Sequence, residues 1–285
     1  MNNPTIGFIG QGYIGKNYAD DFEGRGYSVV RYALEEPFSG NKETIGQCDI
    51  VFIAVPTPTT PAGFSAEVVQ SAVGLVKSGG IAVIKSTILP GSTRHIQATY
   101  PEVIVLNSPE FLSESSAAHD AANPPQNIIG MPEDTEKYRE AARLVLSVLP
   151  KAPSELICKS EESEMFKYVH NINGYFQIVM FNLLYDLSTG VGADWNVVKQ
   201  AISADPFMRT IYTNPVHKTG RGAGGHCFIK DFAALKEVYK DTVPDALGLD
   251  VFDALERKNN MLLLESKKDL NLLKEVYGQN ILKGE

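Results

Sequence analysis

The feature that most constrains the fold of this chain is an apolar run at residues 5–9 that leads directly into a G-x-G-x-x-G sequence. Its glycines are Gly10, Gly12 and Gly15, and a helical pattern follows at residues 13–24. Glycines at this spacing permit a tight turn from a strand into a helix, and they let a phosphate group approach the helix N-terminus. A lone match is weak, but a strand before it and a helix after it are the context that supports a dinucleotide site. The alternative is a glycine turn that binds nothing.

The first half of the chain alternates short apolar runs with helical patterns. The apolar runs are rich in Val and Ile and occupy residues 5–9, 28–32, 49–55, 81–85 and 103–106. The helical patterns occupy residues 13–24, 65–77 and 135–149. Buried parallel strands have this character, so we predict an α/β fold with an N-terminal Rossmann doubly wound parallel sheet. The link between the second and third runs leaves little room for a full crossover helix.

The second half of the chain is mainly helical. From residue 161 to residue 187, apolar side chains recur at helical spacing, at Met165, Val169, Ile172, Phe176, Val179, Leu183 and Leu187. Further helical patterns occupy residues 194–203, 228–240 and 250–276. Prolines near residues 150–160 suggest the boundary, which predicts an NAD-binding Rossmann domain at 1–155 and a helical catalytic and dimerisation domain at 156–285. The long apolar stripe needs further cover, so we expect a homodimer.

The composition is that of a globular protein and argues against several classes of function. The chain has 285 residues and a net charge of −8, which does not support a nucleic-acid partner. Its 3 cysteines are widely spaced, which fits a reducing compartment and argues against a disulfide scaffold or a metal site. The longest apolar stretch, around residues 172–187, is interrupted by polar residues, so we expect no membrane span. No signal sequence is recognisable at the N-terminus, and we expect a cytoplasmic location.

A cysteine at the start of a helical pattern is the strongest candidate nucleophile. Cys227 follows Gly224 and Gly225. The unpaired N–H groups and the positive end of a helix favour the thiolate form of a cysteine there. The two glycines have no Cβ, so a substrate can approach their backbone, and Lys230 and Asp231 return toward the sulfur after one helical turn. The alternative is a buried structural cysteine in a loop-to-helix turn.

Two further pairs of polar residues could take part in chemistry. Lys167 and Asn171 are one helical turn apart, with Gly174 leaving room beside them, and such a pair can stabilise an oxyanion. Glu110 and Glu114 follow the fifth apolar run, where one carboxylate could act as a general base and the other could orient a ligand. In each case the alternative is a solvated helix face.

Two loops are expected at the carboxyl edge of the sheet, where cofactor and substrate bind in doubly wound folds. Val55-Pro56-Thr57-Pro58 ends the third apolar run, and a loop that contains Thr87 ends the fourth. Ordinary turn chemistry is the alternative for each loop.

The acidic residue that usually binds the ribose of NAD is absent from the end of the second apolar run. Tyr32 and Ala33 occupy that place, and Glu35 and Glu36 come slightly late. Arg31 could instead favour the 2′-phosphate of NADP. We expect NAD, with NADP as the alternative.

Taken together, these motifs resemble those of the UDP-glucose/GDP-mannose dehydrogenase family. In chain order they read G-x-G-x-x-G, VPTP, KSTILPGST, SPEFLSE, SEMFKYVHN and GAGGHCFIKD. The resemblance covers most of the chain and implies two successive NAD-dependent oxidations of the C6 alcohol of a nucleotide-sugar, with UDP-glucose as the expected substrate. The family's third, C-terminal domain is expected to be absent.

The resemblance also implies roles for individual residues. Cys227 would capture the aldehyde as a thiohemiacetal that becomes a thioester, while Lys167 and Asn171 would stabilise oxyanions. Asp231 and Thr87 would help to position water, and Glu110 resembles the candidate general base for hydrolysis. The implied cofactor contacts are Gly10, Gly12, Tyr13, Ile14, Gly15, Val55, Pro56, Thr57, Thr87, Glu114 and Lys230. The implied substrate contacts are Phe111, Leu112, Lys167, Asn171, Arg209, Gly224 and Gly225.

Two other functions remain as alternatives. A β-hydroxyacid dehydrogenase shares the two-domain plan, performs one oxidation and needs no cysteine. A catalytically inactive module would keep NAD and turn nothing over. The sequence departs from the family pattern near Arg209, which lies beside rather than at the position of a basic substrate contact, and at Gln126, which replaces a common Arg.

Overall fold

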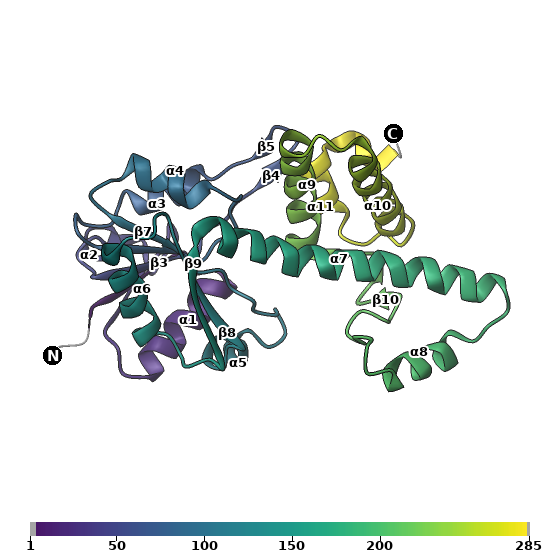
Figure 1. Ribbon diagram of the computed structural model, residues 1–285, viewed down its shortest axis with the longest axis horizontal. Coiled ribbons are helices and arrows are strands. Elements are labelled where there is room, and N and C mark those ends of the chain that lie inside the picture. The colour runs from purple at the N-terminus through teal and green to yellow at the C-terminus, as the bar shows by residue number, and fades with distance from the viewer. Residues whose placement is uncertain (1–3, 284–285) are drawn as a thin grey trace. The chain divides into compact units, whose positions relative to one another are not determined.

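The computed structural model describes residues 4–283, which form two compact units (Figure 1). Unit 1 comprises residues 4–57 and 65–167, and unit 2 comprises residues 58–64 and 168–283. The boundary expected near residues 150–160 coincides with strand β9 (Ser154–Lys159), which belongs to the sheet of unit 1. The change of unit falls instead within helix α7 (Ser160–Gly190).

Unit 1 is built on a 7-stranded sheet in the order β2-β1-β3-β6-β7-β8-β9. The other strands are β1 (Ile6–Ile9), β2 (Val29–Tyr32), β3 (Ile50–Ile53), β6 (Ile81–Ile84), β7 (Ile104–Asn107) and β8 (Gln126–Met131). All neighbouring strands are parallel except β7 and β8, which are antiparallel. The four residues of β1, β3 and β6 are all buried, as apolar runs covered on both faces require. The predicted doubly wound α/β sheet is thus confirmed.

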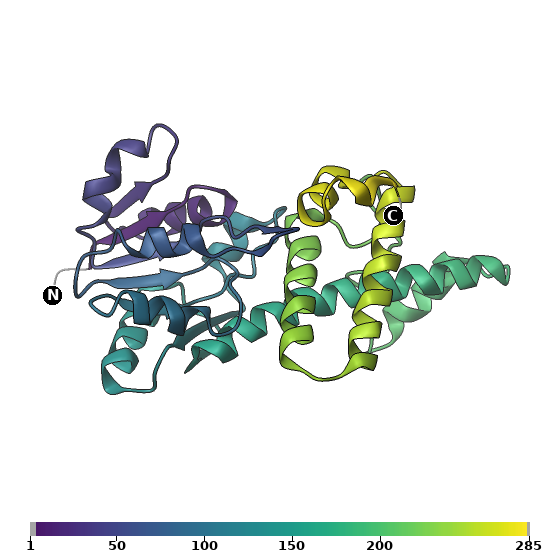
Figure 2. The ribbon, with the colours of Figure 1, turned by 90° about the horizontal axis from the view of Figure 1, so that it is seen from above.

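Helices cover both faces of this sheet (Figures 1 and 2). On one face lie α1 (Tyr13–Gly24), α5 (Ala117–Ala122) and α6 (Glu136–Val148), and on the other lie α3 (Glu67–Val73) and α4 (Ser92–Thr99). The first face forms the main core, in which the rings of Phe8 and Phe52 stack 5.0 Å apart and Phe22 of α1 meets Phe8 edge-on at 5.4 Å. As expected, β2 and β3 are joined without a full crossover helix, through η1 (Ser39–Asn41) and the short α2 (Lys42–Ile45).

Several elements of unit 1 were not predicted from the sequence. Strands β8 and β9 and helices α4 and α5 escaped prediction, since polar residues interrupt their patterns. Strand β9 lies at the edge of the sheet, and none of its residues is fully buried, so it lacks the apolar run of a central strand. The helical pattern at residues 65–77 produces only α3, which ends at Val73 before Gly74.

Unit 2 is a helical assembly with two small hairpins. Its helices are the second part of α7, α8 (Trp195–Ala204), α9 (Gly225–Thr242), α10 (Ala246–Glu265), α11 (Leu270–Tyr277) and η2 (Gln279–Lys283). Its hairpins pair β4 (Thr59–Thr60) with β5 (Gly63–Phe64) and β10 (Val216–His217) with β11 (Gly220–Arg221). In Figure 2, α9 and α10 run side by side and are joined by a short connection. None of the helices described, over residues 4–283, is long and apolar enough to cross a membrane.

The long helical patterns of the second half are realised with two differences. The pattern at residues 250–276 is broken into α10 and α11, with Lys267 and Asp269 both in the left-handed region at φ 53°. The apolar stripe of α7 is also divided: Ile172 and Val179 are buried, whereas Leu187 is 63% exposed. Part of the stripe therefore forms the core, and the rest faces outward.

Candidate active site

The three glycines where β1 turns into α1 are present for different reasons. Gly10 has φ +89°, and a Cβ there would lie 2.2 Å from the carbonyl oxygen of Ala54. A Cβ on Gly15 would lie 1.9 Å from the carbonyl oxygen of Gly10. At Gly12, by contrast, a Cβ would meet no atom within 4 Å. The fold thus requires glycine at positions 10 and 15, while Gly12 leaves open space beside the backbone.

That open space lies at the N-terminus of α1, which suits an anion. Gly12 is the N-cap residue, no side chain caps the helix, and no acidic residue occurs in its first turn, where Tyr13 and Ile14 stand. Strands β2 and β3 pair with opposite sides of β1, so this edge is the switch point at which doubly wound sheets bind dinucleotides. The helix dipole and the unpaired N–H groups favour a pyrophosphate there. The residues present therefore fit a dinucleotide.

The loop after β3 lines the same edge of the sheet. Val55 donates its backbone N–H to Ser86 Oγ at 2.9 Å, and this hydroxyl donates to the Val55 carbonyl at 2.7 Å. These bonds hold the loops after β3 and β6 together. Pro56 is exposed, Thr57 is buried, and Thr87 is half-buried. The role of Ser86 was not predicted, because a lone serine after a strand reads as an ordinary turn residue.

Arg31 is already engaged by two carboxylates. On β2 its guanidinium forms ion pairs of 2.7 Å with both Asp20 and Glu23 of α1. Its charge is thus balanced within unit 1. The idea that Arg31 selects the 2′-phosphate of NADP gains no support from this geometry.

Glu110 and Lys167 form a buried ion pair in unit 1. Lys167 Nζ donates to Glu110 Oε1 at 2.9 Å and to the Glu110 carbonyl at 2.6 Å. The backbone N–H of Leu112 donates to Glu110 Oε2 at 2.7 Å, and the ring of Phe111 lies 5.3 Å from Lys167 Nζ. Both charged side chains are almost fully buried, so the solvated alternatives for them are wrong. Glu114, four residues later in the same loop, is exposed.

A second buried lysine lies beside this pair. Lys85, directly after β6, donates to the carbonyl and the hydroxyl of Ser108 at 2.9 and 3.1 Å. Burial lowers the pKa of Lys85 to about 7, with Lys167 acting in the same direction and Glu110 opposing it. The sequence contained Lys85 within a motif, but nothing in its pattern revealed that the ammonium is buried.

Glu164 joins the loop after Thr87 to α7. Its carboxylate accepts hydrogen bonds from the N–H of Gly91 at 2.6 Å, the N–H of Thr93 at 2.8 Å and the hydroxyl of Thr93 at 2.6 Å. It thereby caps the start of α4, and it lies three residues before Lys167 on α7. Burial raises the pKa of Glu164 to about 7, against the hydrogen bonds that lower it. Sequence reasoning missed this residue.

Cys227 is the third residue of α9 and is half-buried. The N-cap residue is Gly224, and no acidic residue occurs in the first turn of the helix. Gly225 has φ +80°, and a Cβ there would meet no atom within 4 Å. A Cβ on Gly224 would lie 2.0 Å from Asp269 Oδ2, so that space is occupied by a carboxylate of the protein. The room that the sequence suggested at both glycines exists only at Gly225.

Asn171, Lys230 and Asp231 meet in unit 2. Asn171 Nδ2 donates to Asp231 Oδ2 at 2.6 Å, and Lys230 Nζ donates to Asp231 Oδ1 at 2.5 Å. Asn171 is 5% exposed and Asp231 is 1% exposed, so the solvated alternative for Asn171 is wrong. The room expected beside Gly174 is absent, because Phe228 would lie 3.0 Å from a Cβ there. Arg209 is exposed.

The other two cysteines are Cys48, which is buried, and Cys158, which is partly buried. Burial raises the pKa of both Cys48 and Cys158 to about 11, which disfavours the reactive thiolate at these positions. Over residues 4–283, no group of three or more His, Cys, Asp or Glu side chains is arranged to hold a metal ion.

Comparison with known proteins identifies both units. Residues 34–147 match the NAD binding domain of the UDP-glucose/GDP-mannose dehydrogenase family, and residues 161–260 match its central domain. A UDP-glucose 6-dehydrogenase of Rickettsia bellii is 26% identical over 249 residues, which are 84% of this chain and 56% of that protein. One of Rhizobium meliloti is 30% identical over 213 residues, which are 70% of this chain and 48% of that protein. The chain thus spans about half the length of the curated relatives it matches.

Solved structures agree on the fold. A UDP-glucose dehydrogenase of Pyrobaculum islandicum superposes with a TM-score of 0.78 at 25% identity, covering 93% of this chain and 71% of that one. A 3-hydroxyisobutyrate dehydrogenase of Mycobacterium tuberculosis superposes with a TM-score of 0.69 at 17% identity, covering 90% of this chain and 95% of that one. At this identity the similarity establishes a shared fold and nothing more. The matched domain and the open glycine turn indicate NAD as the cofactor of unit 1. The chain belongs to the UDP-glucose/GDP-mannose dehydrogenase family.

Proposed function

We propose that this chain oxidises the C6 alcohol of a nucleotide-sugar to a carboxylate with NAD, and that UDP-glucose is its substrate. One observation carries the proposal. Cys227 stands at the start of α9, three and four residues before Lys230 and Asp231. The buried Asp231 accepts hydrogen bonds from Lys230 and from Asn171, and the other unit of the chain has the glycine turn of an NAD site. A four-electron oxidation needs an intermediate that can be oxidised again without release of the aldehyde, and a thiolate can provide one.

NAD, when bound, accepts one hydride in each of the two oxidations. The thiolate of Cys227 adds to the aldehyde carbon formed by the first oxidation, so that a C–S bond forms and the oxygen takes up a proton. The second oxidation removes the remaining hydrogen of that carbon as hydride and the hydroxyl proton, which leaves a thioester. Water then attacks the thioester, the C–S bond breaks, and Cys227 departs as the thiolate. The balance is two NAD reduced for each carboxylate formed.

The polar residues have distinct roles in this scheme. Lys167 and Asn171 stabilise the oxyanions, and their burial supports this role because hydrogen-bond donors are most effective where water is excluded. Asp231 is held by Asn171 and Lys230, which fixes its carboxylate for positioning water. Thr87 assists in this step. Glu110 accepts a proton during hydrolysis, after its carboxylate has given up its contact with Lys167.

The proposal is tested by incubating the full chain with NAD and UDP-glucose and following absorbance at 340 nm. We expect two NADH for each UDP-glucuronic acid formed, and we expect Cys227→Ser to form no acid. Cys48→Ser is the matched control, because the Cys48 thiol is buried. An oxidation that yields one NADH and survives in Cys227→Ser would favour the β-hydroxyacid dehydrogenase alternative. Absence of NAD reduction with every nucleotide-sugar would support an inactive module.

We further propose that the chain acts as a cytoplasmic homodimer. The last turns of α7 carry exposed apolar side chains at Leu183, Leu187 and the following Val191, and Phe207 beyond α8 is 95% exposed. Leu183 and Leu187 are one helical turn apart on the same face of α7, and exposed apolar surface that is shared by neighbouring side chains commonly marks an interface. Leu187→Lys should convert a dimer into a monomer in light scattering coupled to size exclusion, whereas a wild-type monomer would contradict the proposal.

A further inference from the structure

The loop that precedes Cys227 is held by side chains from the end of α10 and the segment after it. Asn259 is fully buried and makes two hydrogen bonds with the backbone of Ala223: Oδ1 accepts from its N–H at 2.7 Å, and Nδ2 donates to its carbonyl at 3.0 Å. Lys268, also buried, donates to the carbonyl of Gly222 at 2.8 Å. These contacts link residues that are 36 and 46 positions apart in the chain.

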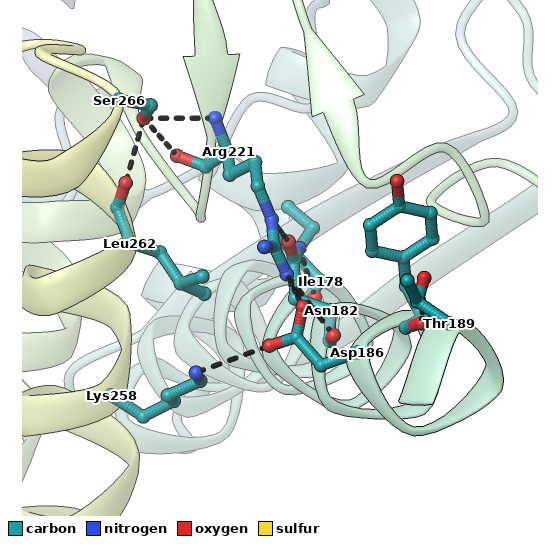
Figure 3. A network of polar contacts seen from close by, with 9 residues as sticks. Ile178, Asn182, Asp186, Thr189, Arg221, Lys258, Leu262 and Ser266 are labelled. Carbon is teal, nitrogen blue, oxygen red and sulfur yellow. Dashed lines mark hydrogen bonds and ion pairs between the residues drawn. The ribbon is translucent and has the colours of Figure 1, made fainter. Parts of the chain in front are cut away.

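Arg221, at the beginning of the same loop, is held on two sides (Figure 3). Its backbone N–H donates to Ser266 Oγ at 3.0 Å. Its guanidinium donates to Asn182 Oδ1 and Asp186 Oδ1 of α7, each at 2.7 Å, and Lys258 of α10 also approaches Asp186, at 3.4 Å. The loop is thus fixed to both α7 and the α10–α11 segment before it reaches Cys227.

The last contact of this loop is a carboxylate at the start of α9. Asp269 Oδ2 accepts a hydrogen bond from the N–H of Gly225 at 2.7 Å, in the space left by the missing side chain of Gly224. Asp269 is the N-cap residue of α11, yet its side chain makes no capping bond to α11. Its backbone adopts the left-handed conformation, at φ 53°. Asp269, the N-cap residue of α11, therefore caps the start of α9 with its side chain.

We propose that Asp269 is a positioning residue for Cys227 that caps α9 from outside the helix and sets the pH at which the thiolate forms. The inference rests on the proposed role of Cys227 as the nucleophile. A negative charge at a helix N-terminus offsets the positive end of the dipole. A second negative charge two residues further along the helix is then less favourable, which raises the pKa of the thiol relative to an uncharged cap. Asp269 thereby holds the start of α9 in place and disfavours ionisation of the Cys227 thiol at low pH.

Unit 2 carries several other charged or titratable groups near the start of α9. They are His226, Lys230 and Asp231 on α9, Lys268 next to Asp269, and His217 and Lys218 in the β10–β11 hairpin. The hairpin faces Asp269: burial, Lys268 and Lys218 lower the pKa of His217, while Asp269 raises it. Of the elements packed against α9, α10 carries Asp253 and Glu256, whose carboxylates pair with Lys236 about three turns further along α9, and α11 carries Lys274 in its last turn. Asn171 of α7 and Asn259 of α10 are neutral. A substitution at Asp269 that preserves its shape leaves all these groups in place.

The test is the pH dependence of alkylation of Cys227 by iodoacetamide in Asp269→Asn and in the wild-type chain. Asparagine keeps a carbonyl acceptor for Gly225 and tolerates the left-handed backbone, so it removes the charge alone. The Cys227 peptide is quantified by mass spectrometry between pH 6 and pH 9.5. We expect the midpoint to fall by about 0.5 to 1 pH unit, which is about three- to tenfold faster alkylation at neutral pH. Asp269→Ala should shift the midpoint similarly and lower the melting temperature as well.

Asp194→Asn is the matched control. Asp194 caps α8 in the same unit through a hydrogen bond of 2.8 Å from the N–H of Asn196, so its loss removes an N-cap charge from a different helix. We expect no change in the midpoint for Cys227. An unchanged midpoint in Asp269→Asn, an equal shift in Asp194→Asn, or a thiol that alkylates in neither Asp269→Asn nor the wild-type chain overturns the inference. Alkylation needs neither NAD nor a sugar. Lack of turnover together with a shifted midpoint would therefore reject the proposed function and keep the role of Asp269.

Discussion

Replacement of Lys85 by methionine is expected to remove a pH-dependent penalty from the folded chain. Lys85 is 3% exposed, and burial lowers the pKa of its ammonium from 10.5 to about 7. Because this pKa is below that of the unfolded chain, the unfolded chain binds more protons between pH 7 and pH 10.5. Stability must therefore rise with pH over this range. The penalty is fully present below pH 7 and vanishes above pH 10.5.

The size of the effect follows from the shift. At 1.36 kcal/mol for each pKa unit, the full penalty is about 5 kcal/mol, and about 2 kcal/mol of it should be relieved between pH 7 and pH 9. Methionine also removes the two hydrogen bonds to Ser108, which costs about 1–3 kcal/mol. That second cost does not depend on pH. The difference in unfolding free energy between wild type and Lys85→Met should thus move by about 2 kcal/mol in favour of wild type from pH 7 to pH 9.

Urea unfolding at pH 7, 8 and 9 measures this difference. Hydrogen exchange of the β6 and β7 amides should be the probe, because it reports on unit 1, whereas Trp195 lies in unit 2. Lys16→Met, on the exposed side of α1, is the control and should leave the pH dependence of the wild-type chain unchanged. A difference between wild type and Lys85→Met that stays constant within about 0.5 kcal/mol over this range would refute the argument.

Four further substitutions test other parts of the chain. Gly12→Ala should leave stability almost unchanged and weaken NAD binding at least tenfold in calorimetry. Gly15→Ala should instead lower the melting temperature, because its Cβ would lie 1.9 Å from a carbonyl oxygen. Equal melting temperatures of the two variants would contradict this expectation. Burial raises the pKa of Glu164 from 4.5 to about 7, so its contribution to stability is present below pH 4.5 and is lost as pH rises through 7. Relative to Glu164→Gln, wild type should lose about 2 kcal/mol between pH 5 and pH 7.5 in urea unfolding, and a constant difference would exclude this. Asn171→Leu should destabilise unit 2 by about 1–3 kcal/mol, because the buried carboxylate of Asp231 loses a hydrogen-bond donor. Fluorescence of the single tryptophan during unfolding measures this change. Unchanged stability would show that water replaces the lost donor.

Local sequence patterns were sufficient to predict the elements whose residues are all in the same environment, such as strands buried on both faces. The apolar runs of β1, β3 and β6 lie buried in the middle of the sheet, and their composition alone predicted them. The glycines before α1 and Cys227 at the start of α9 were likewise recognisable, because turn geometry and helix starts depend on neighbours in the chain. Edge strand β9 was missed, since half-exposed strands carry polar residues.

Contacts between distant residues decided the rest. Lys167 and Glu110 are 57 positions apart, and Asp269 and Gly225 are 44 positions apart, so no local pattern could show that each pair meets. The sequence by itself determined which residues can carry charge, attack a carbonyl or permit a turn. Only the tertiary structure decided which charges lose their water and which partner each then binds. Desolvation depends on everything packed around a group, and for this reason it cannot be read from neighbours in the chain.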